Sequence, residues 1–351
     1  MSNNVSQLHT AHKNKSDEFY TQYIDIDNEL SRYDISEFMG KIVLCNADNP
    51  YESNFFRWFV NNFNKLGLKM LICSCYNGNG HQPTRLKTSH FPRLYYYENS
   101  LFDSDEDIIR KAYCVIIEDV PSGFIMSEND RSSDIDYLML QNGNSMTTLK
   151  SGDFRSAEVI SLLKTADVVV TNPPFSLFRE FVAQLITYDK KFLIIGNQNA
   201  ITYKEIFPLF KENKIWLGYG FKRNMAHFIS PYEDTANDLD HKEGMIRVSG
   251  VMWFTNIENT KRHQWYILAK TYNPKEYPKY DNYDGIDVSK SQDIPKDYAG
   301  VMGVPITFMD KYNPRQFELV GFRKGDDGKD LSVNGKCPYF RVLIRNREPE
   351  K

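Results

Sequence analysis

Short apolar segments rich in β-branched residues alternate with segments of helical spacing through the first two thirds of the chain. The apolar segments are KIVLCN (41–46), KMLICSCY (69–76), YCVIIEDV (113–120), ADVVVTN (166–172) and KFLIIGN (191–197), and helical spacing occurs over 54–67, 156–165 and 178–188. Strands that alternate with helices pair in parallel and are covered by helices on both faces. The sequence therefore predicts a doubly wound α/β sheet over residues 15–216.

The pattern changes past Trp216, where segments become shorter and richer in Tyr, Asn, Asp and Pro. We expect residues 217–299 to be loop-rich and to have a task of their own. Strand-like alternation returns at 303–312, 317–324 and 339–346, so residues 300–345 should supply strands that complete the fold, either in the main sheet or in a small sheet of their own. Residues 1–14 read as a flexible leader and 346–351 as a tail.

Composition narrows the class of protein. The cysteines are odd in number and lack metal-ligand spacing, which predicts reduced thiols and no zinc: Cys45, Cys73, Cys75, Cys114 and Cys337. No apolar run approaches the roughly 18 to 20 residues of a membrane span, so a cytoplasmic protein with no membrane association is expected. The net charge of −3 allows a nucleic-acid enzyme only if the positive charge gathers on one face.

The most informative motif is Asn172, Pro173, Pro174 and Phe175, which follows a predicted strand and precedes a predicted helix. Ligand sites of open α/β sheets lie at that edge. Two prolines fix φ and remove two backbone donors, so the loop presents hydrogen-bond acceptors. As a bare tetrapeptide, however, the motif is equally well a rigid corner.

Methylation of an exocyclic amine explains the acceptors. The lone pair of such a nitrogen is delocalised into its ring, and the Asn172 side-chain oxygen and the Pro173 carbonyl could accept its two N–H groups and draw it towards tetrahedral geometry. Phe175 would stack on the base. A base inside a duplex is out of reach, so the target nucleotide must be flipped out. No strong general base is needed, because the proton leaves an already cationic amine.

Four sequence strings, one of which contains this motif, occur in the order known from one protein family. They are KSDEFYTQ (15–22), GDFRS (152–156), TNPPFSLFREFV (171–182) and GVMGVPITFMDKYNP (300–314). Together they resemble the EcoRI-type adenine-specific DNA methyltransferase family. The resemblance implies a Rossmann-like methyltransferase fold with a loop-rich C-terminal target-recognition region, S-adenosylmethionine as the cofactor, duplex DNA as the partner and N6-methyladenine as the product. It leaves open whether a cognate restriction endonuclease acts alongside, and whether the protein is a monomer or a dimer.

The same resemblance suggests cofactor contacts near the N-terminus. Phe19, Tyr20 and Thr21 are expected to wrap the methionine end of S-adenosylmethionine, where aromatic rings can face a sulfonium. The alternative is that Phe19 and Tyr20 only pin the N-terminal arm to the core.

The turn after the first strand contains Asn46, Asp48, Pro50 and Ser53 and has no Gly-x-Gly. We interpret it as a degenerate cofactor loop in which Asp48 receives the methionine ammonium and the following helix N-terminus faces the carboxylate. A plain helix-capping role for Asp48 or Ser53 is the alternative.

Further contacts are expected at the ribose and the adenine of the cofactor. The second strand ends without the acidic residue that commonly binds a ribose, which leaves Glu118 or Asp119 as candidates. By the resemblance, Asp153 binds the adenine amine of the cofactor, Phe154 lies against its ring, and Asn172 contacts the cofactor as well as the substrate.

Basic residues beside aromatic ones mark the second half. Lys222, Arg223, Arg247, Lys261 and Arg262 are predicted to contact DNA phosphates, which favours a target-recognition region over 217–299. Each of these basic side chains, taken alone, could equally be an ordinary solvent-exposed charge with no DNA contact.

Two other functional interpretations stay open. One is methylation of another planar nitrogen, such as cytosine N4, a base in RNA or a protein glutamine; the other is a catalytically inactive DNA-binding relative. A dinucleotide oxidoreductase is disfavoured, because no Gly-x-Gly-x-x-Gly follows the first strand.

Overall fold

The structure is a computed structural model that describes residues 20–75, 112–221, 225–229 and 245–350. The chain divides into two compact units. The first contains Met1–Asn197 and Gly220–Ile257, and the second contains Gln198–Tyr219 and Glu258–Lys351. The expected recognition region, 217–299, is therefore shared between the two units.

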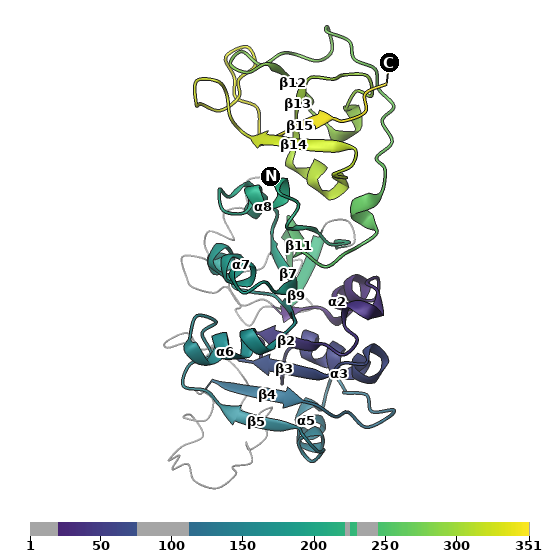
Figure 1. Ribbon diagram of the computed structural model, residues 1–351, viewed down its shortest axis with the longest axis vertical. Helices are drawn as coiled ribbons and strands as arrows, with labels where there is room; N and C mark the ends of the chain where they lie inside the picture. The colour runs from purple at the N-terminus through teal and green to yellow at the C-terminus, as the bar shows by residue number, and fades with distance from the viewer. Residues whose placement is uncertain (1–19, 76–111, 222–224, 230–244, 351) are drawn as a thin grey trace. The chain divides into compact units, whose positions relative to one another are not determined.

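A mixed sheet forms the centre of the first unit (Figure 1). In spatial order the strands that this unit supplies are β5 (Ser145–Thr148), β4 (Tyr113–Ile117), β3 (Met70–Ser74), β2 (Ile42–Asn46), β6 (Val168–Thr171), β7 (Lys191–Asn197) and β11 (Val251–Thr255). Strands β2, β6 and β11 are buried along their whole length, which agrees with their continuous apolar runs.

Strand direction departs from the prediction at one edge. Strands β3, β2, β6 and β7 are parallel, as expected, and confirm the doubly wound centre. Strand β4 runs antiparallel to β3, and β5 and β11 are also antiparallel to their neighbours. The prediction of a parallel β4 is wrong because its apolar run shows burial but carries no information about direction.

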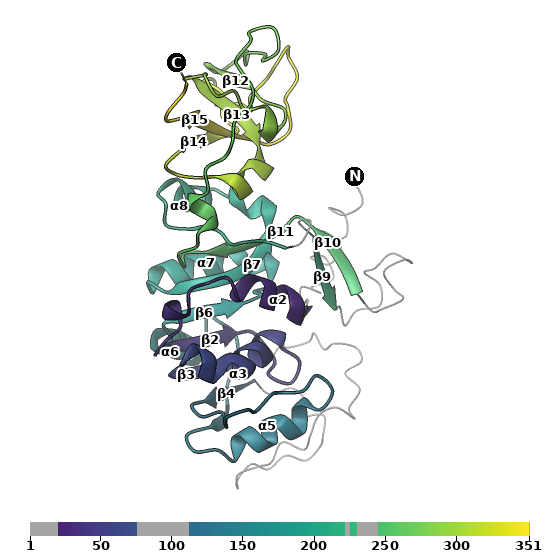
Figure 2. The ribbon, with the colours of Figure 1, turned by 90° about the vertical axis from the view of Figure 1, so that its right-hand side faces the viewer.

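Helices cover both faces of this sheet (Figures 1 and 2). Helices α2 and α3 lie on one face, and α6 and α7 lie on the other. The helical elements of the unit are α2 (Tyr23–Leu30), η1 (Ile35–Glu37), α3 (Asn54–Leu66), α5 (Arg131–Met139), α6 (Ala157–Thr165), η3 (Phe175–Leu177) and α7 (Phe178–Thr187).

Helix α3 shows how the local sequence sets the elements beside the site. Ser53 caps it by accepting a hydrogen bond from the Phe56 amide at 3.1 Å, and Gly67 ends it with a φ of 60°. Its buried face carries Phe56, Phe59 and other apolar side chains at helical spacing. The N-terminus of α3 is thereby held at the end of β2.

A small sheet accompanies the central one. Strand β9 (Met225–Ile229) lies between β1 (Tyr20–Thr21) and β10 (Met245–Ser249), and both pairings are antiparallel. Figure 2 shows β9 and β10 projecting from the central sheet. The N-terminal arm is thus joined to a strand more than 200 residues further along the chain.

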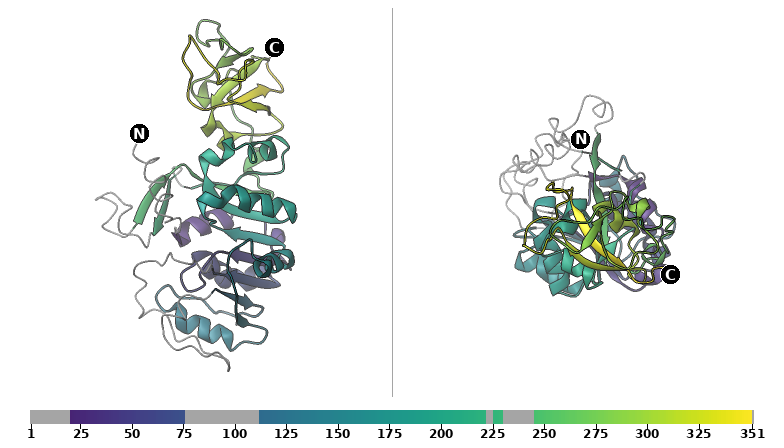
Figure 3. Two further views of the ribbon diagram at one scale, coloured as in Figure 1. Left: turned by 90° about the vertical axis from the view of Figure 1, so that its left-hand side faces the viewer. Right: turned by 90° about the horizontal axis from the view of Figure 1, so that it is seen from above.

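The second unit has its own four-stranded sheet, drawn in green and yellow in Figure 3. Its order is β12 (Gly285–Asp287), β13 (Val301–Pro305), β15 (Arg341–Asn346) and β14 (Phe317–Phe322). The unit also contains η4 (Gln198–Thr202), α8 (Phe207–Lys211), β8 (Trp216–Leu217), η8 (Lys261–His263), η9 (Ser291–Asp293) and η10 (Ile306–Lys311).

The C-terminal strands therefore build a separate sheet, which was one of the two arrangements expected. The segment predicted as a strand over 303–312 is strand only to Pro305 and then turns into η10. Pro305 explains the change, because it cannot donate to the ladder and its fixed φ suits the start of a helical turn. Among the described residues, no helix is long and apolar enough to cross a membrane.

Candidate active site

The Asn-Pro-Pro-Phe loop connects β6 to α7. Asn172 directly follows the last strand residue, Pro173 is buried, and the Pro174 carbonyl accepts a hydrogen bond from the Leu177 amide at 3.0 Å. That bond turns the chain into η3 and then into α7. The Pro174 oxygen thus closes the turn, so the prediction that it faces a ligand is wrong. For Asn172 and Pro173 the acceptor role stays a prediction.

The turn after β2 is built without glycine. Ala47 adopts a φ of 59°, in the left-handed region where glycine is the usual residue. The Asp48 amide donates to the Ser74 carbonyl at 2.9 Å, and the Cys73 thiol donates to the Asp48 carbonyl at 3.2 Å. The fold therefore keeps the glycine-type turn that the sequence lacks, and β3 supports it.

The carboxyl group of Asp48 connects this turn to the Asn-Pro-Pro-Phe loop. Ser53 donates to Asp48 Oδ1 at 3.0 Å, and Thr171 Oγ1 lies 2.6 Å from Asp48 Oδ2. Burial raises the pKa of Asp48 to about 7, although the hydrogen bonds from Thr171 and Ser53 act in the opposite direction. Thr171 was missed in the sequence, although its place before Asn172 at a strand end was a usable signal.

Two buried polar atoms beside this turn test whether the cofactor fits. The Asn46 side-chain nitrogen and the Thr21 hydroxyl are buried and have no hydrogen-bond partner within the described part of the chain. Such atoms destabilise a protein unless a ligand or water satisfies them. A polar ligand with an ammonium group near Asp48 would do so, and the methionine end of S-adenosylmethionine fits this requirement.

Two residues expected at the cofactor adenine are engaged elsewhere. Asp153 accepts three hydrogen bonds from Arg155, and these hydrogen bonds lower the pKa of its carboxyl group. Phe154 is 4% exposed and packs edge-on against Phe181 in the core. These contacts support a structural role for both residues, and the predicted adenine contacts stay predictions.

The ribose candidates lie at the wrong edge of the sheet. Strand β4 is antiparallel, so Ile117 at its end pairs with Leu71 near the beginning of β3. Glu118 and Asp119 follow Ile117 and are exposed. The turn after β2, where the cofactor is predicted to bind, lies at the other end of β3, where Ser74 donates to Asn46 Oδ1 at 3.1 Å. If the cofactor binds at that turn, neither acid is placed to approach its ribose.

The N-terminal residues are described only in part. Phe19 lies outside the described residues, and of Tyr20 only the backbone is described. The Thr21 carbonyl accepts a hydrogen bond from the Asn54 side chain at 2.8 Å, which holds the arm against the start of α3. Pro50 is buried in the same turn. The structure thus brings Thr21, Asp48 and the start of α3 together.

The predicted DNA contacts have mixed outcomes. Lys222 and Arg223 lie outside the described residues, and Arg247 is described only by its backbone in β10. Lys261 is bound to the carbonyls of Gly218 and Tyr219, both at 3.0 Å, and to a carboxylate oxygen. Its charge is already neutralised inside the second unit, which does not favour a phosphate contact.

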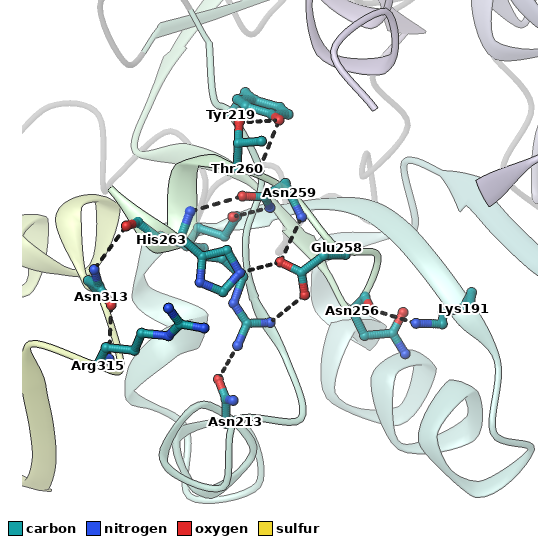
Figure 4. A network of polar contacts seen from close by, with 12 residues as sticks. Lys191, Asn213, Tyr219, Asn256, Glu258, Asn259, Thr260, His263, Asn313 and Arg315 are labelled. Carbon is teal, nitrogen blue, oxygen red and sulfur yellow. Dashed lines mark hydrogen bonds and ion pairs between the residues drawn. The ribbon is translucent and has the colours of Figure 1, made fainter. Parts of the chain in front are cut away.

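Arg262 is likewise held inside the second unit by neighbours that include Asn213 and Glu258. Figure 4 shows Asn213, Glu258 and His263 in this network. The Arg262 guanidinium lies 3.5 Å from the centre of the Trp216 ring and donates to Asn213 Oδ1 at 2.5 Å. Glu258 lies 3.6 Å from the guanidinium and 2.6 Å from the His263 ring nitrogen. Burial lowers the pKa of Arg262. This residue supports the unit's own fold, and its predicted phosphate contact is not favoured.

The largely parallel central sheet, with helices on both faces, is the Rossmann-like fold of methyltransferases. A family model described as adenine-specific methyltransferase EcoRI matches residues 7–347. The chain belongs to this EcoRI-type family of adenine-specific DNA methyltransferases, which confirms the resemblance, and it is a type II enzyme that uses S-adenosylmethionine.

The similarity to known relatives covers nearly the whole chain. It is 48% identical to the type II methyltransferase M.EcoRI of Escherichia coli, over 98% of this chain and 97% of the relative. It is 34% identical to M.MpnI of Mycoplasma pneumoniae, over 96% and 97%, and 33% identical to M.MgeORF184P of Mycoplasma genitalium, over 98% and 100%. No solved structure gave a match.

Proposed function

We propose that this enzyme methylates the N6 amine of an adenine that has rotated out of the DNA duplex, and that Asn172 and Pro173 hold that amine. The observation that carries the proposal is the contact between Thr171 and Asp48, because it connects the loop that would hold the base to the turn that would hold the cofactor. A reaction between two bound molecules needs both in one fixed geometry.

The chain's own groups have separate tasks in this proposal. The cofactor supplies an electrophilic methyl group on a sulfonium. The Asn172 side-chain oxygen and the Pro173 carbonyl accept the two N–H groups of adenine, so the lone pair of the nitrogen leaves the plane of the ring. Phe175, which is partly buried at the start of η3, stacks on the base and holds its plane.

Proton removal needs no dedicated base. The methylated amine is cationic and acidic, so it can lose its proton to water. Asp48 would not take that proton, because its two oxygens face Ser53 and Thr171. Its task would be to balance the ammonium group of the cofactor.

We assign DNA recognition to the second unit. The second unit has more Lys and Arg than Asp and Glu, while the whole chain has a net charge of −3. It also exposes large apolar side chains, among them Trp265 at 53%, Ile267 at 85% and Tyr339 at 89%. Cationic surface with exposed aromatic rings suits contacts to phosphates and bases.

A restriction endonuclease is the functional partner that we infer from the type II relatives. An endonuclease of the same specificity would cut the unmethylated site and spare the methylated one. Expression of this enzyme in a cell should then protect its DNA against such an endonuclease. Equal cleavage of DNA from cells with and without the enzyme would argue against that pairing.

Transfer of a labelled methyl group tests the reaction. The purified protein is incubated with mixed-sequence duplex DNA and methyl-labelled S-adenosylmethionine, and the nucleosides are then separated by mass spectrometry. Label in N6-methyladenine is the expected result. Label in N4-methylcytosine, or label only in RNA or protein glutamine when these are offered, would replace the proposed acceptor with another planar nitrogen.

A further inference from the structure

Arg131, the first residue of α5, extends its side chain to the start of α3. Its Nη2 donates to Asn54 Oδ1 at 2.6 Å, and the Nδ2 of the same Asn54 donates to the Thr21 carbonyl at 2.8 Å. The other terminal nitrogen, Nη1, is buried and has no hydrogen-bond partner among the residues that the structure describes. Arg131 therefore has an unused donor next to the residues that hold the N-terminal arm.

The surroundings of Arg131 make that unused donor costly. Burial lowers the pKa of Arg131 to about 10, and the neighbouring Arg57 acts in the same direction. Arg57 is itself occupied, since it lies 3.3 Å from Glu128 and stacks on the Tyr23 ring. A buried guanidinium with a free N–H is stabilised when an anion binds it.

Two groups of opposite charge thus contact consecutive residues at the N-terminus of α3. Asp48 contacts Ser53, and Arg131 contacts Asn54, the next residue along the chain. The methionine end of S-adenosylmethionine is a zwitterion whose ammonium and carboxylate are attached to one carbon. A helix N-terminus also favours a carboxylate. The pair of charges therefore matches the pair on the ligand.

We propose that Arg131 binds the carboxylate of the methionine end of S-adenosylmethionine through Nη1, while Asp48 binds the ammonium. The inference rests on the proposed function, because it takes the turn around Asp48 as the cofactor site. It adds a residue from α5, which lies outside every string that carries the family resemblance.

Two ligands separate a carboxylate contact from general damage to the site. S-adenosylhomocysteine has the amino-acid end, whereas 5′-methylthioadenosine has the same nucleoside and sulfur without it. Their dissociation constants are measured by calorimetry for the wild type, Arg131→Met and Arg131→Lys. Lys65→Met is the matched control, because Lys65 is an exposed cation at the far end of α3.

We expect Arg131→Met to bind S-adenosylhomocysteine about 10- to 100-fold more weakly, the range for a charged hydrogen bond. Its affinity for 5′-methylthioadenosine should stay within about twofold of the wild type. Arg131→Lys should lose less, since it keeps the charge. Lys65→Met should bind both ligands as the wild type does.

Other outcomes would overturn the inference. Unchanged affinity for S-adenosylhomocysteine in Arg131→Met would remove the contact. An equal loss for both ligands, or a large fall in the melting temperature, would mean that Arg131 only supports the fold. If the wild type bound 5′-methylthioadenosine and S-adenosylhomocysteine equally well, the carboxylate site would be absent while the nucleoside site remained. If it bound neither, the proposed function would fail as well.

Discussion

Thr171 Oγ1 lies 2.6 Å from Asp48 Oδ2 and 2.5 Å from the Asn46 carbonyl. A hydroxyl has one hydrogen, so Thr171 can donate to only one of the two oxygens. If it donates to the carbonyl, the short contact with Asp48 needs a proton on the carboxyl group. This agrees with the burial that raises the pKa of Asp48 to about 7.

Cofactor affinity should therefore depend on pH through Asp48. Below pH 7 the carboxyl group of the free protein is protonated and neutral, and it attracts an ammonium group less strongly. We expect the affinity for S-adenosylhomocysteine to fall as the pH drops from 8 to 6, and Asp48→Asn to bind weakly at both values. Calorimetric titration at the two pH values measures this.

Asp48→Asn should weaken cofactor binding but stabilise the ligand-free protein. The pKa of Asp48 is higher in the folded protein than its ordinary value of 3.8, so the folded state binds this proton more tightly. The contribution of Asp48 to the stability of the folded protein therefore becomes unfavourable as the pH rises from about 4 to about 7, and it stays unfavourable above pH 7. Asp48→Asn should raise the free energy of unfolding of the ligand-free protein at pH 8. If Asp48→Asn were less stable than the wild type at pH 8, the ionised Asp48 carboxylate would instead stabilise the folded protein.

Phe175 should matter more to the displaced base than to the cofactor. We expect Phe175→Ala to weaken the complex with the flipped adenine by about 10-fold, because base–aromatic stacking contributes about 1–3 kcal/mol. The fluorescence of 2-aminopurine at the target position, once that position is mapped, reports the unstacked base. A variant that instead lost affinity for S-adenosylhomocysteine would move Phe175 into the cofactor site.

Gly196 in β7 allows Phe178 to pack at the start of α7. A Cβ at this position would lie 2.4 Å from the Phe178 ring and 2.9 Å from the Phe254 ring. We expect Gly196→Ala to lower the free energy of unfolding by about 1–3 kcal/mol, as overpacking does. Gly321 in β14 is the matched control, because its added Cβ would meet Leu343 at an ordinary 3.7 Å. Equal losses in urea denaturation would exclude the clash as the cause.

Ala47 has a strained backbone that glycine would relieve. A left-handed conformation costs an alanine about 1–2 kcal/mol, and glycine loses part of that gain through its greater unfolded-state entropy. Ala47→Gly should therefore raise the free energy of unfolding by up to about 1 kcal/mol, and Ala47→Val should lower it. Urea denaturation measures both, and a stabilising valine would contradict the left-handed turn.

The sequence predicted the strands that carry both halves of the site. The runs ending at Asn46 and Thr171 are short, continuously apolar and bounded by turn residues, a pattern that indicates buried strands. Ser53 was expected either at the cofactor or as a helix cap, and the capping role is confirmed. Capping depends on neighbours along the chain, so it can be read locally.

Features that depend on distant partners could not be predicted. The direction of β4 decides where Glu118 and Asp119 lie, and it follows from pairing with β3 rather than from the residues of β4. Ala47 can adopt a left-handed conformation because contacts of Asp48 with Ser74 and Thr171 hold the turn. The internal contacts of Arg262 likewise come from residues far along the chain, so its charge alone suggested a surface position.

The most direct test of the account compares methyl transfer and cofactor binding in Asn172→Ala. Asn172 is proposed to act chiefly in the transition state, so its loss should slow single-turnover formation of N6-methyladenine by about 100- to 1,000-fold. The affinity for S-adenosylhomocysteine should change by less than about threefold. Methyl transfer at the wild-type rate, in a variant that binds the cofactor normally, would contradict the assignment of the amine to Asn172.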